Sequence, residues 1–283
     1  MLPFRQRLEQ AREALLRADF LLLGGGAGLS AAAGLDYGGA RFDKYFSDYK
    51  ERYGISDMYA GMFYLFGSAE ERWAHHARHI LVNRFEEPAS PLYRRLFSLF
   101  GGREHFVITT NVESQFEKAG FDAAKIFEVQ GNYGFLQCAK GCHDRLYADE
   151  GLIREMVSET REFRIPSALI PRCPVCGEEM EIHIRKDTRF VENADWHRMR
   201  ERYEAFLQRA ARGRTVLLEL GVGFNTPGII RFPFEQMTYE NENATLIRCN
   251  RDAPEGFPET RKRTIAFTEN MNEVFPYADT ARS

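Results

Sequence analysis

The stretch "LLLGGGAGLSAAAGLDYGG", residues 21–39, carries an apolar run directly into three glycines. Residues 20–23 have the pattern of a buried strand that the glycines end, and residues 29–33 are able to start a helix. A strand, a glycine-rich turn and a helix in this order are the usual entry to a doubly wound parallel sheet. So little side chain at the end of a strand indicates that something large comes close to the backbone there.

The size, charge and apolar content of the chain exclude several classes of protein. Its 283 residues suffice for one large domain that carries an inserted smaller one, and 44% hydrophobic residues support a sizeable core. A net charge of -3 argues against a nucleic-acid binder, which normally shows a basic stripe. No apolar run has the length of a membrane span, and the charged N-terminal segment lacks the features of a signal peptide. We therefore expect a cytoplasmic protein that binds neither nucleic acid nor membrane.

Later segments repeat the pattern of an apolar strand that ends in polar or small residues. The predicted strands are 105–111, 126–131, 215–223, 244–250 and 264–267. Two further segments, 4–18 and 195–212, have the pattern of helices. This alternation of strands and helices predicts an α/β fold with a parallel sheet.

The residue composition and pattern of the sequence change in two segments, and each change indicates an insertion into the sheet domain. Residues 41–95 are aromatic and helical in pattern, and residues 132–190 are rich in cysteines and turns. The predicted fold is a Rossmann-like doubly wound parallel sheet with an inserted helical module and a small zinc-ribbon module. The sheet domain comprises 1–40, 96–131 and 191–283. We read the aromatic run "MYAGMFYLF" of the helical module as core.

Four of the five cysteines form two close pairs. Cys138 and Cys142 lie in "CAKGC", and Cys173 and Cys176 lie in "CPVCG" about thirty residues later. In a reducing compartment such pairs indicate metal before disulfide, and this separation suits a tetrahedral thiolate zinc site. Four thiolates leave no open position, so the zinc would be structural. The alternative is four unrelated buried cysteines. Cys249 has the pattern of a buried strand residue.

The glycine-rich turn has two interpretations on its own. It is a turn that needs positive φ, or it lets a pyrophosphate lie against the backbone at a helix N-terminus. The order of the motifs along the chain decides between them. "GAGLSAAAG", Asp36-Tyr37, "TTN" at a strand end, "QG", the two cysteine pairs, "GVG" and "RCN" follow one another. From about residue 20 to residue 250, this order resembles the sirtuin family.

The sirtuin resemblance implies an NAD-binding Rossmann domain with a helical and a zinc module. Gly26, Ala27 and Gly28 would let the NAD phosphates approach the backbone, and Ser30 would hydrogen-bond one of them. A bulky residue at Gly28 is then expected to abolish NAD binding without unfolding the chain.

The departures from the sirtuin pattern bear on the chemistry. Sirtuin deacylases carry a catalytic His-Gly where this chain has Gln130-Gly131, eight positions before Cys138. Glutamine has no group that titrates near neutral pH, so it cannot accept a proton from a ribose hydroxyl. Further departures are Val112-Glu113, Gly221-Val222-Gly223 and the basic segment 182–190. Whether Arg41 replaces the family arginine that follows Asp-Phe stays open.

This combination resembles the macrodomain-linked (class M) sirtuins of microbes, which also carry a Gln for the His and a Gly-Leu-Asp-Tyr turn. The resemblance implies an NAD-dependent protein ADP-ribosyltransferase. Its protein acceptor would be a lipoyl-carrier protein similar to the glycine-cleavage H protein. It also implies a functional link to a macrodomain hydrolase.

Three residues are predicted to be catalytic. Asn111, at a strand end, would hold the nicotinamide ribose and a water; alternatively it caps the next helix. Gln130 would hydrogen-bond the ribose hydroxyls, or it is a decayed catalytic position. Arg185 would pair with an acceptor carboxylate or a phosphate, or it is a surface charge. Glu113 is either a base for the acceptor or points at solvent.

The predicted NAD-binding residues follow from the same motifs. Asp36 would orient the nicotinamide side unless it is only a turn residue, Asn250 would hold the adenosine ribose, and Gly221 and Gly223 would clear space for adenine. The full set is Gly26, Ala27, Gly28, Ser30, Asp36, Tyr37, Thr110, Asn111, Gln130, Gly221, Gly223, Asn225 and Asn250.

Three other functions stay open beside the transferase. They are a weak NAD-dependent deacylase, an NAD glycohydrolase in which water replaces the acceptor, and a non-catalytic sensor of NAD or ADP-ribose. The loss of the His argues against the deacylase, and the retained Asn111 argues against the sensor.

Overall fold

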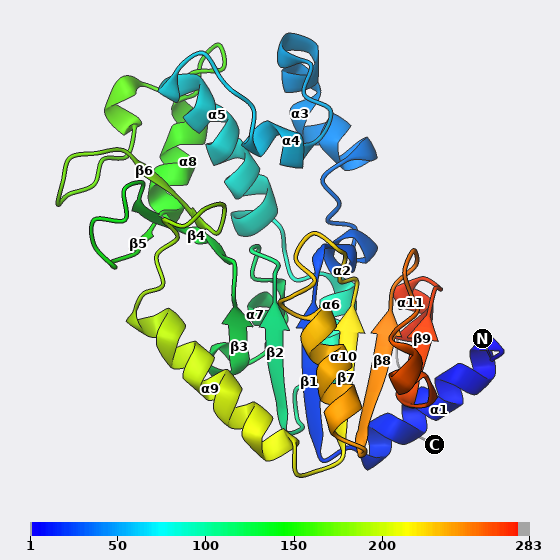
Figure 1. Ribbon diagram of the computed structural model, residues 1–283. Coiled ribbons are helices and arrows are strands. Elements are labelled where there is room, and N and C mark those ends of the chain that lie inside the picture. The colour runs from blue at the N-terminus through cyan, green and yellow to red at the C-terminus, as the bar shows by residue number, and fades with distance from the viewer. Residues whose placement is uncertain (1, 277–283) are drawn as a thin grey trace.

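The computed structural model describes residues 2–276, and its centre is a six-stranded sheet in which all neighbouring strands are parallel. The strand order is β3-β2-β1-β7-β8-β9 (Figure 1). The chain moves outward from β1 on one side and returns beside β1 as β7, so the order reverses between these two strands. The bounds are β1 Phe20–Gly25, β2 His105–Thr109, β3 Ile126–Glu128, β7 Thr215–Leu220, β8 Ala244–Cys249 and β9 Thr264–Phe267.

Helices cover both faces of this sheet because successive side chains of each buried strand point to opposite faces. Leu21 and Leu23 belong to one hydrophobic core and Leu22 to the other. The first core is covered by α1 Phe4–Arg17, α2 Ala27–Ala32, α6 Pro91–Phe100, α7 Gln115–Lys118 and α11 Met271–Val274. The second is covered by α9 Ala194–Ala210 and α10 Arg231–Glu240, and the short helices η2 Ala123–Lys125 and η4 Pro258–Arg263 complete the domain. The predicted α/β, Rossmann-like fold class is confirmed.

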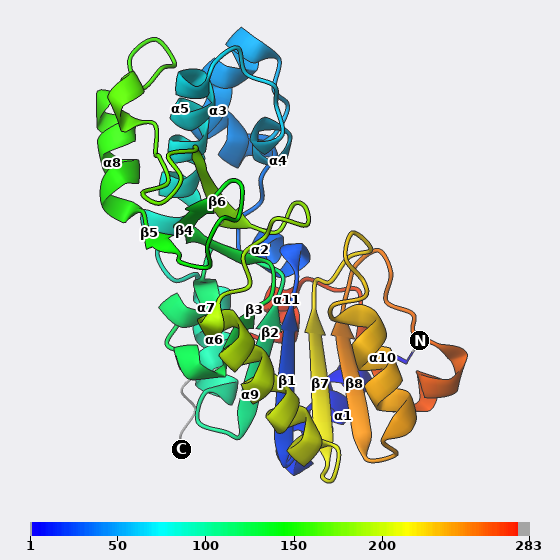
Figure 2. The ribbon, with the colours of Figure 1, turned by 60° about the vertical axis from the view of Figure 1, so that its left-hand side comes forward.

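The two inserted segments meet in one small lobe above the sheet (Figures 1 and 2). Its elements are α3 Gly39–Tyr53, α4 Met58–Met62, α5 Ala69–Ile80, η1 Leu81–Phe85, β4 Gly131–Cys138, β5 Tyr147–Ala148, α8 Glu150–Glu159, η3 Ser167–Leu169 and β6 Met180–Ile184. The strands form an antiparallel sheet in the order β5-β4-β6. Trp73 and Ile80 of α5 share a hydrophobic core with Met156 of α8 and Cys138 of β4. The two insertions therefore stabilise each other, and the limits given above for three modules stay a prediction.

The aromatic run at 58–66 is only partly core. Met58 is fully buried, whereas Tyr59, Phe63 and Leu65 are 58%, 54% and 94% exposed. The expectation that this run is core is wrong for these three residues. Tyr59 lies on the exposed side of α4, and Phe63 and Leu65 follow the end of that helix at Met62.

Two glycine-bearing loops cross directly above the β1–β7 pair. Gly28 N–H donates to Gly221 O over 2.9 Å, and Gly26 N–H donates to Leu220 O over 3.0 Å. A Cβ added at Gly28 would lie 2.8 Å from Gly221 Cα. Gly221 has a left-handed φ of +63°, and a Cβ there would lie 2.2 Å from Leu29 N. These glycines are therefore needed for the two loops to pack, apart from any ligand.

We predict that Gly28→Ala destabilises the folded chain, because the new methyl group would displace the backbone of the β7 loop. The expected loss is about 1–3 kcal/mol in the free energy of unfolding, measured by denaturant titration. Gly228→Ala is the matched control, since a Cβ there meets nothing within 4 Å. This revises the expectation that a bulky residue at Gly28 affects NAD binding alone. Equal stability of the two variants would contradict the revised prediction.

Candidate active site and metal centre

A cleft of about 570 Å³ lies at the carboxyl ends of β1, β7 and β8. This is where ligands bind in open parallel sheets, beside the point at which the strand order reverses. Eight of the predicted NAD-binding residues line it: Gly26, Ala27, Gly28, Thr110, Gly221, Gly223, Asn225 and Asn250. The remaining five, Ser30, Asp36, Tyr37, Asn111 and Gln130, are not among its lining residues.

The side chain of Asn250 holds two walls of the cleft together. Its Nδ2 donates to Val222 O over 2.8 Å, and its Oδ1 accepts from the backbone N–H groups of Asp252 and Ala253. Asn250 therefore shapes the cleft by joining the β7 and β8 loops, and its predicted contact with a ribose stays a prediction.

Asn111 is buried just beyond the end of β2. Its Nδ2 lies 3.0 Å from Gly26 O and 3.0 Å from Ser30 Oγ. The Ser30 hydroxyl in turn donates to the Glu113 carboxylate over 2.5 Å. Ser30 and Glu113 are both buried, so Glu113 does not point at solvent. The inward bond of the Ser30 hydroxyl also leaves its predicted contact with a phosphate without structural support.

Gln130 lies in a tight turn between β3 and β4, because the predicted strand 126–131 ends at Glu128. Asn132 closes the turn by donating to Glu128 over 2.6 Å, and Ser114 donates to the other carboxylate oxygen over 2.9 Å. Burial raises the pKa of Glu128 to about 7, against these hydrogen bonds, which lower it. Gly131 has φ of +94°, a conformation that favours glycine. The turn therefore fixes the backbone position from which the Gln130 side chain extends.

The register of the parallel strands β2 and β3 places Asn111 and Gln130 at equivalent positions beyond the ends of these neighbouring strands. Thr109 of β2 pairs with Glu128 of β3, and each site residue follows its strand residue by two positions. Arg185 joins them, since its backbone N–H donates to Gln130 O over 2.9 Å. Its guanidinium is paired with Glu192 at 2.6 Å and lies over the Phe190 ring, 4.2 Å from the centroid. The three predicted catalytic residues thus come from adjacent segments.

The loop after α2 is tied to the small lobe. The Tyr37 hydroxyl lies 3.3 Å from that of Tyr133, which lies 3.0 Å from His79 Nε2. Burial holds the pKa of His79 well below its usual value, so its ring is neutral. Asp36 is exposed, as a turn residue would be.

Arg41 is engaged within the small lobe. Its guanidinium donates to Asn83 Oδ1 over 2.7 Å, to Val82 O over 3.1 Å and to Glu87 over 3.1 Å. These partners lie on or just after η1, so Arg41 anchors the start of α3 to that segment. Its side chain is only 10% exposed, which leaves it little contact with a ligand.

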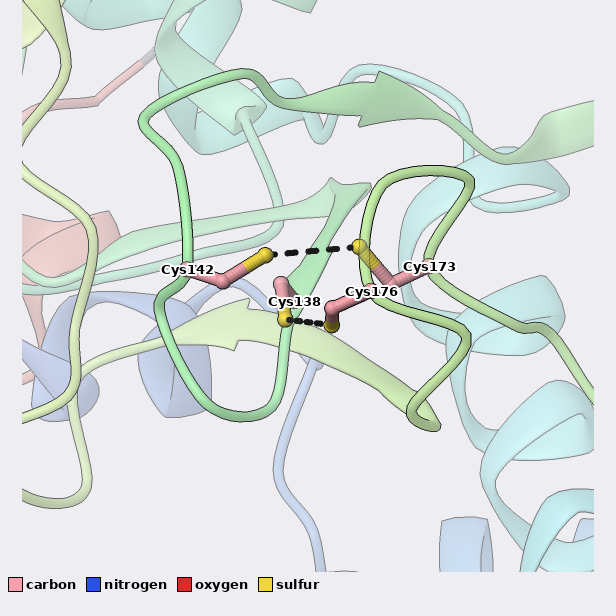
Figure 3. Close-up of side chains that lie close together, drawn as sticks. All are labelled: Cys138, Cys142, Cys173 and Cys176. Carbon is pink, nitrogen blue, oxygen red and sulfur yellow. Dashed lines mark hydrogen bonds between the residues drawn. The ribbon is translucent and has the colours of Figure 1, made fainter.

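The four paired cysteines converge in the small lobe, at the end of β4 and in the loops that follow β4 and precede β6 (Figure 3). Their sulfur atoms all lie within 4.8 Å of one another, and the Cys138–Cys176 and Cys142–Cys173 sulfur pairs are each 3.6 Å apart. A tetrahedral zinc with Zn–S bonds of 2.3 Å places its ligands about 3.8 Å apart. The donor set and its spacing therefore fit a structural zinc. The His143 ring adds a contact with Cys173 Sγ at 3.4 Å.

Several cleft residues escaped the sequence analysis. Thr268, Glu269, Asn270 and Met271 follow β9, and Arg251 and Asp252 follow Asn250. The rule that carboxyl ends of parallel strands face the ligand would have found the residues after β9, because that strand was predicted. No pattern pointed to Tyr93 of α6, whose hydroxyl lies 3.2 Å from Asn111 Nδ2.

The fold and the cleft define a dinucleotide-binding protein of the Rossmann type with a zinc-binding lobe. No family model matches the chain. A protein ADP-ribosyltransferase of Staphylococcus aureus is 36% identical to it over 274 residues, which are 96% of this chain and 87% of that protein. A Fusarium oxysporum protein named probable bifunctional ADP-ribose hydrolase/ADP-ribosyltransferase is 32% identical over 257 residues, 85% of this chain and 42% of that protein. A solved structure of a Sir2 enzyme matches the fold with a TM-score of 0.59 and 18% identity, over 96% of both chains.

The chain therefore belongs to the sirtuin family, and within it to the NAD-dependent protein ADP-ribosyltransferases. Membership of the family and the type of enzyme are both as the motifs predict. Among residues 2–276, no helix is long and apolar enough to cross a membrane. The cytoplasmic location stays a prediction.

We predict that the chain retains one zinc ion after extensive dialysis and that Cys176→Ser loses it. Losing one thiolate should also destabilise the small lobe, because metal binding to such a site contributes directly to folding. Metal analysis of the purified chain checks the first point and thermal unfolding the second. Cys249→Ser is the matched control, since Cys249 lies outside the cluster and should leave the zinc content unchanged. Equal zinc in the Cys176 and Cys249 variants would contradict the site.

Proposed function

We propose that the chain binds NAD in the cleft between β1, β7 and β8 and transfers ADP-ribose to a lipoyl-carrier protein similar to the glycine-cleavage H protein. The observation that carries the transferase chemistry is the Gln130 turn. Eight positions before Cys138, where the sirtuin deacylases that the motifs resemble carry a catalytic histidine, this chain has Gln130, whose amide cannot take a proton near neutral pH.

NAD would supply the bond that breaks, between nicotinamide and ribose C1′. Nicotinamide leaves with the electron pair of that bond, C1′ becomes positively charged, and the acceptor donates an electron pair to it. Asn111 and Gln130 would orient the ribose through their uncharged amides. Carboxylates in this region are already engaged: Glu113 accepts from Ser30, Glu128 from Asn132, and Glu192 from Arg185.

An amide at position 130 in place of a base favours an acceptor group that is already ionised. An Asp or Glu carboxylate is charged at neutral pH and needs no deprotonation before it attacks, unlike a hydroxyl or a lysine ammonium. Arg185 would guide such a carboxylate if it exchanged Glu192 for it, since its guanidinium is about one-third exposed. The lipoyl-carrier acceptor is supported by the sirtuin subgroup that the motifs resemble.

A hydrolase that removes ADP-ribose is the proposed functional partner. The fungal relative is named for both a hydrolase and a transferase activity, and this chain matches 42% of its length. That name supports a macrodomain-type hydrolase working with the present chain.

We predict that a lipoylated carrier protein incubated with the chain and NAD gains ADP-ribose, as intact mass spectrometry would show. Asn111→Ala should stop both this transfer and nicotinamide release, because both pass through the same activated ribose. The carrier without lipoate is the matched control for the acceptor. Nicotinamide release with no labelled carrier would indicate an NAD glycohydrolase, and full transfer by Asn111→Ala would contradict the mechanism.

We predict that Gln130→His does not produce an efficient deacylase. A general base contributes about 10²–10⁴-fold in rate, yet the substrate must also be positioned, and a misplacement of about 1 Å costs about 100-fold. Here the segment beside Gln130 carries the Arg185–Glu192 pair. Release of acetate from an acetyl-lysine peptide, compared with that of the exposed-site control Gln236→His, measures the effect. Strong deacetylation by the Gln130 variant would refute this prediction.

A further inference from the structure

The orientation of the Asn111 amide is determined by its neighbours. Gly26 O lies 3.0 Å from one terminal atom of this side chain, and a backbone carbonyl can only accept. That terminal atom is therefore the nitrogen, Nδ2, whose two protons are shared among Gly26 O, Ser30 Oγ and the Tyr93 hydroxyl. Oδ1 lies on the other side of the amide, and within residues 2–276 no hydrogen bond to it is formed.

The Glu113 carboxylate sets the direction of these hydrogen bonds. A carboxylate accepts only, so the single proton of the Ser30 hydroxyl points at Glu113 Oε1, 2.5 Å away. Ser30 Oγ is then left with lone pairs, and one of them accepts from Asn111 Nδ2. Glu113 Oε2 is held by Val112 N–H over 3.0 Å, so the carboxylate cannot turn away.

Tyr93 gives the chain of bonds a second support. Its hydroxyl lies 3.1 Å from Ser30 Oγ and 3.5 Å from Glu113 Oε1, and it accepts from Asn111. Burial, together with the Glu113 charge, raises the pKa of Tyr93 well above its usual value, so the hydroxyl keeps its proton. The Tyr93 ring packs edge-on against Phe116 at 4.9 Å between centroids, which fixes its position.

Glu113 has no ion pair that would explain its burial. It is 5% exposed, and no salt bridge to it is formed within residues 2–276. A buried carboxylate without a cation is costly to the fold. Its role in the structure is therefore to accept hydrogen bonds, and one of these, from Ser30, connects it to Asn111.

We propose that Glu113 is a positioning residue that acts through Ser30, with support from Tyr93, to hold Asn111 with Oδ1 presented to the ribose. This inference rests on the proposed function, which gives Asn111 its contact with NAD. It replaces the interpretation in which Glu113 points at solvent, because the carboxylate is buried, and it offers an alternative to the interpretation of Glu113 as a base for the acceptor.

Glu113→Gln is the first test. A carboxamide must place its NH₂ beside either Val112 N–H or Ser30 Oγ, so one of the two bonds is lost or reversed. We expect kcat for nicotinamide release to fall about 10- to 100-fold while the Kd for NAD changes less than about 3-fold. Glu117→Gln, whose side chain is exposed on α7, is the matched control and should behave like the wild type.

Ser30→Ala and the double variant separate positioning from a direct or merely structural role. If Glu113 acts through Ser30, adding Glu113→Gln to Ser30→Ala should lower kcat little further. Effects that multiply in the double variant, or an unchanged kcat in Glu113→Gln, would overturn the proposal. Should Glu113→Gln fail to fold, Tyr93→Phe takes its place: the kcat values of Tyr93→Phe, Ser30→Ala and the double variant of these two are compared in the same way.

A measurement without turnover keeps this inference distinct from the proposed function. In NMR spectra of the full chain, the side-chain NH₂ signals of Asn111, identified by their loss in Asn111→Ala, should exchange slowly with solvent. They should exchange faster in Glu113→Gln and not in Glu117→Gln. A wild type that releases no nicotinamide but shows this difference would refute the proposed function alone. Equal exchange in both variants would refute the positioning role.

Discussion

The contact between the β1 loop and the β7 loop is the constraint on which the site depends. Gly26 and Gly28 donate their N–H groups to the backbone of Leu220 and Gly221, at separations that exclude a Cβ. The floor of the cleft is therefore backbone, and a ligand can approach it without meeting side chains. Asn111 is attached to the same crossing, because its Nδ2 donates to Gly26 O. A shift of these loops would move the cleft and the candidate catalytic amide together.

Local patterns in the sequence were sufficient to predict the framework. Apolar strands that end in glycine or a polar residue gave the sheet and the edge at which its ligand residues gather, and eight predicted residues do line the cleft. The cysteine spacing led to a cluster whose geometry fits zinc. These features could be predicted because each depends on residues that are close in sequence, or on the rule that parallel strands share one carboxyl edge.

Features that depend on pairing between distant segments could not be predicted in this way. Glu219 and Arg248 are the single charged residues of two otherwise largely apolar strands. They are register partners on β7 and β8 and form a fully buried ion pair at 2.8 Å. Arg248 also pairs with Glu235 of α10 and donates to Glu255 O, which holds the loop beyond Asn250 in place beside the cleft. The shared core of the two insertions and the inward bond of Ser30 likewise arise only from three-dimensional contacts.

The predicted catalytic side chains Asn111 and Gln130 are amides, which take no proton near neutral pH. Around them, Glu113, Glu128 and Glu192 each accept a hydrogen bond from a fixed neighbour. Amides can orient a ribose by hydrogen bonding. They are weak nucleophiles, so they do not compete with the acceptor for the positively charged C1′. A free base at this position would activate water or a ribose hydroxyl as readily as the acceptor. Under the proposed function, an amide in place of the base would favour transfer to an already ionised acceptor, and Glu113, buried behind Ser30, would align Asn111 without taking part in that transfer.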